Sequence, residues 1–63
     1  MKTFNTVEEA DSYLNDQATR LNIINYNIEE GTNKSGNNIM LLIEEDSEQS
    51  PIRTIQIVKF LNY

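Results

Sequence analysis

The side chains of this sequence that could do acid–base chemistry are carboxylates. Histidine and cysteine are both absent, and ten acidic residues stand against five basic ones. Glycosidase-type catalysis needs two carboxylates about 5–10 Å apart across a cleft. A chain of 63 residues has little room for such a cleft. We therefore interpret the acidic runs as solvated surface charge and predict that the protein is not an enzyme.

Two short motifs begin like ligand sites but lack essential positions. The run "EEDSE" at 44–48 has neither the alternating acids nor the central glycine of a calcium loop. The run "GTNKSG" at 31–36 begins like a phosphate-binding loop, but Asn37 and Asn38 replace its lysine and hydroxyl residue. The absence of cysteine and histidine also removes disulfides and nearly all transition-metal sites. We predict no cofactor and no metal.

The charge balance points to a protein partner. A net charge of −5 disfavours direct binding to DNA, RNA or an anionic membrane, because phosphate contacts require lysine and arginine. A basic protein surface is the natural complement. The longest apolar run is five residues, which predicts no membrane span, no signal peptide and a cytoplasmic location. Nine asparagines and eight isoleucines suggest an AT-rich coding sequence, as in a low-GC bacterium or one of its phages.

The clearest predicted element is a helix from about 7 to 20. Thr6 occupies the N-cap position and Glu9 follows three residues later, which is the pattern of a capping box. In that motif the Thr6 hydroxyl accepts from the Glu9 N–H, and the Glu9 carboxylate reaches the Thr6 N–H. Asp16 and Arg20 form an i,i+4 pair. One apolar stripe at helical spacing contains Val7, Ala10, Leu14, Ala18 (or Gln17) and Leu21.

Three strands are predicted after the helix. The first alternates apolar and polar residues from Ile24 to Ile28, and the second runs from 38 to about 45. The segment 52–63 favours a strand with a bulge near 57–58, where the apolar pattern changes face. An alternative is a terminal helix that uses Ile52, Ile55, Val58 and Leu61.

The order helix, strand, strand, strand predicts a single α+β domain over residues 1–63. Short connections make consecutive strands antiparallel neighbours, so we expect a three-stranded meander with the helix across one face. The segment "KTF" before the helix is expected to be an extended arm or a short N-terminal edge strand.

Both faces of this sheet are expected to be apolar, because Ile39 to Ile43 are five apolar residues in a row. We assign one set to the helix-covered face: Ile24, Tyr26, Ile28, Ile39, Leu41, Ile43, Ile55 and Ile57. We assign a second set to the opposite face, as a self-association surface: Ile23, Met40, Leu42, Val58 and Phe60. Burying one such side chain stabilises a fold by about 1.5–3 kcal/mol, so exposing several is costly in a small domain. The alternative is that Met1, Phe4 and the segment 61–63 cover this face.

Two functional hypotheses follow. The first is a non-enzymatic interaction module, in its sharpest form an acidic inhibitor that occupies the nucleic-acid-binding surface of another protein. Its partner-binding carboxylates would be Glu29, Glu30, Glu44, Glu45, Asp46 and Glu48. A hairpin places the group at 29–30 either beside the group at 44–48 or at the opposite end of the sheet. The second hypothesis is an assembly subunit that forms a homodimer through its apolar sheet face.

Overall fold

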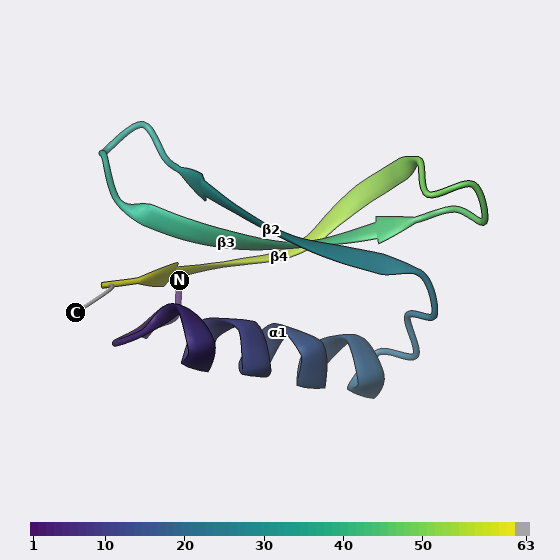
Figure 1. Ribbon diagram of the computed structural model, residues 1–63, viewed down its shortest axis with the longest axis horizontal. Coiled ribbons are helices and arrows are strands. Elements are labelled where there is room, and N and C mark those ends of the chain that lie inside the picture. Colours follow the sequence, from purple (N-terminus) through teal and green to yellow (C-terminus); the bar gives the residue numbers. More distant parts are fainter. Residues whose placement is uncertain (62–63) are drawn as a thin grey trace.

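The chain forms one helix packed on one face of a four-stranded sheet in the computed structural model, which describes residues 1–61 (Figure 1). The elements are β1 (Thr3–Phe4), α1 (Val7–Arg20), β2 (Tyr26–Thr32), β3 (Asn38–Glu45) and β4 (Pro51–Phe60). The strand order is β1-β4-β3-β2. Strands β2, β3 and β4 form an antiparallel meander, and β1 pairs in parallel with β4. The predicted α+β class, the element order and the short edge strand are confirmed.

Local signals at both ends of α1 explain its bounds. The Thr6 hydroxyl accepts from the Glu9 N–H at 3.2 Å, as predicted, but it also donates to the Glu9 carboxylate at 3.2 Å. At the other end, Asn22 adopts the left-handed conformation with φ of 58°. The Ile23 N–H then bonds to the Ala18 carbonyl at 2.9 Å, which is the Schellman pattern that ends a helix.

Strand β4 carries the predicted bulge two residues earlier than expected. Leu42 pairs with Gln56 and Ile43 pairs with Thr54, so Ile55 is the extra residue. A second register shift lies between Glu44 and Glu45. Because β4 continues to Phe60, the alternative of a terminal helix is wrong; residues 62 and 63 lie outside the described part of the chain.

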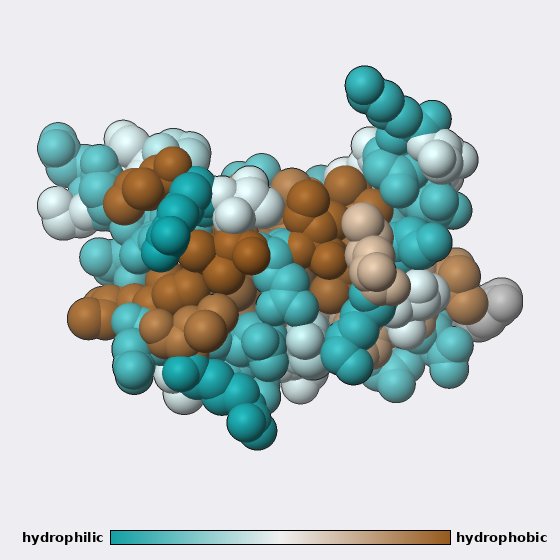
Figure 2. Space-filling model, turned by 180° about the vertical axis from the view of Figure 1, so that it is seen from behind, coloured by the Kyte–Doolittle hydropathy of each residue, from teal (hydrophilic) through white to brown (hydrophobic). Residues whose placement is uncertain are grey.

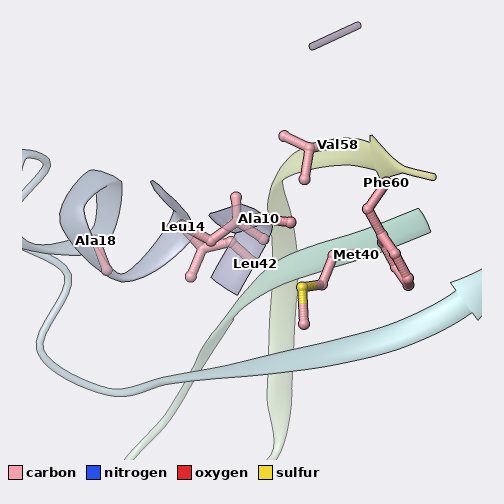
Figure 3. Packing of buried hydrophobic residues seen from close by; sticks show 7 residues of the cluster. All are labelled: Ala10, Leu14, Ala18, Met40, Leu42, Val58 and Phe60. Carbon is pink, nitrogen blue, oxygen red and sulfur yellow. The ribbon is translucent and has the colours of Figure 1, made fainter. Parts of the chain in front are cut away.

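The core lies between α1 and the two central strands (Figure 3). Two tyrosine hydroxyls form hydrogen bonds between the helix and the sheet at the edge of the core. Tyr26 donates to Asn15 Oδ1 at 2.8 Å, and Tyr13 accepts from Gln56 Nε2 at 2.9 Å. The buried apolar residues are Ala10, Leu14, Ala18, Met40, Leu42, Val58 and Phe60.

The predicted assignment of the sheet faces is therefore wrong for β3 and for the end of β4. The residues placed on a self-association surface lie on the covered side: Met40, Leu42, Val58 and Phe60 are buried under α1, and Ile23 packs against them. The apolar side chains of α1 extend only a short way toward the sheet, because two of the three buried residues of the helix are alanines. Long side chains from the sheet, such as Met40 and Phe60, fill the space that remains.

Candidate functional site: the open face of the sheet

The sheet face that points away from α1 carries a row of aliphatic side chains. Ile39, Leu41 and Ile43 alternate with the buried residues of β3, and Ile57 pairs with Leu41 from β4. These four residues define what we call the open face. The three residues of β3 are partly buried by their neighbours, whereas Ile57 is 37% exposed. Within residues 1–61, no helix or strand lies over them (Figure 1).

The N-terminal arm does not cover the open face. The alternative considered above placed it over Met40, Leu42, Val58 and Phe60, and of the arm Phe4 does pack against that cluster, which α1 covers. Strand β1 extends the sheet beside β4 instead of crossing it. Phe4 points to the helix side, where its ring lies 5.1 Å from that of Tyr13, and Met1 is exposed. Leu61 is 47% exposed and its N–H bonds to the Phe4 carbonyl. The rest of the segment 61–63 lies outside the described residues.

A glycine widens the exposed part of the aliphatic row. Gly31 of β2 pairs with Ile39 of β3, and it has no side chain that could cover Ile39. A Cβ at this position would meet Ile39 Cγ1 and Leu41 Cδ1 at 3.8 Å, which is ordinary contact. Packing therefore does not require glycine here. A glycine inside a strand often marks a place where another molecule approaches the backbone closely.

The twist of the sheet shapes the open face into a saddle. Strand β2 rises toward the β2–β3 turn at one end, and β4 rises toward the β3–β4 turn at the other (Figure 1). Figure 2, seen from behind, shows a dip between the two raised turns, with hydrophobic and polar residues along it.

The two predicted acidic groups are separated along β3 and do not lie beside each other, a question that the sequence left open. Glu29 and Glu30 pair with Leu41 and Met40, toward the β2–β3 turn. The group at 44–48 ends β3 and forms the next turn. Leu41 and Glu45 are four residues apart, which corresponds to about 13 Å along the strand.

The six predicted carboxylates have different surroundings. By strand alternation, Glu29 and Glu45 point to the open side, whereas Glu30 and Glu44 point to the helix side. Glu44 accepts from Arg53 Nε at 2.8 Å, an ion pair at the surface. Sequence reasoning could not separate the acids that point to the open side from those that point to the helix side.

Asp46 has a structural role in the β3–β4 turn. Its Oδ1 accepts from the backbone N–H groups of Glu48 and Ser50, at 2.9 and 3.0 Å. This arrangement holds a turn in which Gln49 adopts a positive φ of 66°. Glu48 is exposed at the tip of the same turn.

A second apolar surface lies beside β4 and was not found from the sequence. A groove of about 330 Å³ separates the end of α1 from the first half of β4. Figure 2 shows a hydrophobic area at this end of the molecule. Nearby exposed residues include Ile24, at 89%, and Ile52, at 58%. The groove is lined by Leu21, Ile23, Arg53, Thr54 and Ile55.

A third feature is an acidic depression on the helix. It measures about 590 Å³ and has the Phe4–Tyr13 ring pair at its base. The Lys2 ammonium lies 5.4 Å from the centre of the Tyr13 ring, so this chain supplies a cation of its own there. Helical spacing brings its polar residues to one side: Glu8, Glu9, Ser12 and Asp16.

Among residues 1–61, one ionisable group has a shifted pKa. The Asp16 carboxylate accepts from Arg20 Nε at 2.7 Å, and this hydrogen bond, with the charge attraction, raises the pKa of Arg20 above its usual value. A raised pKa on a base contributes stability below its unfolded value and loses it only as pH rises through the folded value. The Arg20 shift therefore adds no pH dependence near neutrality.

The described residues hold no group of three acidic side chains arranged to bind a metal ion. Among them, α1 is too short and too polar to cross a membrane. Comparison of the chain with protein-family models, curated proteins and solved structures finds no match.

Proposed function

We propose that this protein is a non-enzymatic interaction module that binds a partner protein with a basic surface through the open face of its sheet. The observation that carries the proposal is the uncovered row of Ile39, Leu41 and Ile43, with Glu29 beside Leu41 and Glu45 beyond Ile43. An exposed apolar patch with a polar rim is typical of a protein interaction site.

The charges support a basic partner. Glu29 and Glu45 point to the open side, and Asp46 and Glu48 add negative charge at one end. Lys59 is the one base among the described strand residues that alternation places on this side. With a net charge of −5, the protein attracts basic surfaces over a Debye length of about 8 Å at physiological salt. An inhibitor that covers a nucleic-acid-binding surface is one form of this function.

The test is a capture experiment in extracts of the source cells at low and moderate salt. The baits are the wild-type protein, Leu41→Lys on the open face and Ser12→Lys on the exposed side of α1. Both variants add one positive charge, so they are matched. We expect captured proteins to be lost with Leu41→Lys, kept with Ser12→Lys and reduced at moderate salt.

Circular dichroism verifies that both variants are folded before the comparison. Capture that survives Leu41→Lys but is lost with Ser12→Lys would place binding on the helix and contradict the proposal. Capture that neither variant affects would also contradict it.

A further inference from the structure

The charge pattern of the open face disfavours a second copy of the chain as its occupant. Two copies packed face to face would bring four carboxylates into the interface, Glu29 and Glu45 of each copy, against two Lys59 side chains from the strands. An excess of like charge in an interface costs affinity and suppresses the wrong partner. The occupant should carry positive charge toward Glu29 and Glu45.

The free edges of the sheet disfavour an extended peptide that would add as a further strand. The part of β4 that β1 leaves unpaired contains Pro51 and two register shifts. The outer strand β2 carries Glu29 and Glu30. Proline, bulges and charges are the features that protect strand edges from pairing. A ligand is therefore expected on the face of the sheet.

The covered face of the same sheet shows which element fits this curvature. α1, a helix of 14 residues, lies along the strands and buries Met40 and Leu42. Twist makes a sheet saddle-shaped on both faces, so a helix can lie along β3 on the open face in the same way. Helices on both faces of a sheet are a common layered arrangement.

The spacing of Glu29 and Glu45 predicts how far apart the basic residues should lie on a helix that binds the open face. Glu45 lies about 13 Å along β3 from the position of Glu29, and a helix rises about 1.5 Å per residue. This distance corresponds to about eight or nine helical residues, and of these a separation of about eight keeps both bases nearer one side of the helix. Apolar residues three and four apart would contact Ile43 between these bases, Leu41 level with Glu29, and Ile39 beyond it.

We propose that the open face binds an amphipathic helix of a partner protein, with an apolar row along Ile39, Leu41 and Ile43 and lysine or arginine toward Glu29 and Glu45. This inference rests on the proposed function and names the partner's binding element. It corresponds to the mode in which an apolar helix face lies in a complementary surface.

The test uses a display library of random 16-residue peptides. The wild-type protein selects peptides after removal of those that bind Leu41→Lys. We expect recovered sequences with apolar residues at i, i+3 or i+4 and i+7 and with flanking lysine or arginine. Bound peptides should gain helical circular dichroism, and affinity should fall at least tenfold with Leu41→Lys. Ile57→Lys, at a more exposed position, is the second variant in case Leu41→Lys does not fold.

Recovery of acidic or alternating, strand-like peptides, or of none, would overturn the helix proposal. A wild-type dimer in sedimentation equilibrium that Leu41→Lys converts to a monomer would assign the face to a second copy instead. If extracts still give capture that depends on Leu41 while no helical peptide is recovered, the proposed function stands and the helix does not. If Leu41→Lys changes neither experiment, both fail.

Discussion

Gly31 lies opposite Ile39 in the β2–β3 pair, and its missing side chain leaves one side of the aliphatic row uncovered. The space beside it would accept a Cβ at ordinary contact distance from Ile39 and Leu41. Glycine also weakens a strand because it loses more conformational freedom on folding than other residues. A stabilising side chain is therefore absent beside Ile39 on the open face.

Gly31→Val should stabilise the isolated protein by about 0.5–1 kcal/mol, because valine favours a strand and covers Ile39. The same change should weaken partner capture, because its methyl groups occupy the docking surface. Urea denaturation measures the first effect and the extract experiment measures the second. Stabilisation with unchanged capture would show that the partner does not approach this side of the row.

Adjacent residues of β3 should differ sharply in their effect on stability. Leu42→Ala removes a fully buried side chain and should cost about 2–5 kcal/mol, enough to unfold a domain of this size. Leu41→Ala, on the open face, should cost less than about 1 kcal/mol. Thermal unfolding by circular dichroism compares them. The reverse order would mean that the two faces are exchanged in solution.

Asp46 should behave as a turn residue. Asp46→Ala loses the acceptor for two backbone N–H groups and should lower the free energy of unfolding by about 1–2 kcal/mol. Asp46→Asn keeps an Oδ1 acceptor and should recover most of this stability. Glu48→Ala, at the exposed tip, is the neutral control. Equal losses for Ala and Asn would show that the charge of Asp46, and not its acceptor oxygen, matters.

The hydrogen bond from Tyr26 to Asn15 should couple β2 to α1. Tyr26→Phe should cost about 0.5–1.5 kcal/mol, because the partly buried Asn15 oxygen loses its donor. A double-mutant cycle with Asn15→Ala measures the pair itself, and a coupling of at least about 0.5 kcal/mol is expected. Strictly additive losses would contradict a direct bond.

Much of the fold follows from local patterns in the sequence. The capping residues Thr6 and Glu9 and the apolar period predict α1 with its observed bounds. The strand at 38–45 and the bulge in the last strand are also predictable, although the bulge falls at Ile55. The first strand was placed too early, since Ile24 belongs to the connection after the helix.

The candidate binding surface was harder to predict because it depends on which side of the sheet each strand residue points to. The sequence identifies the acids at 29–30 and 44–48, but only the antiparallel register places Glu29 and Glu45 on the open side and Glu30 and Glu44 on the helix side. The groove beside β4 joins the end of α1 to residues more than 30 positions later, and no local pattern marks that contact.

The sequence by itself determined the order of the elements, the negative charge and the surplus of apolar residues in β3. Those properties depend on composition and on contacts within a few residues. Only the tertiary structure decided which of the two alternating sets of residues in the run Ile39–Ile43 faces the helix. Both sets are apolar, so either could face the core. The shallow, alanine-rich stripe of α1 favours Met40 and Leu42, which leaves Ile39, Leu41 and Ile43 on the open face.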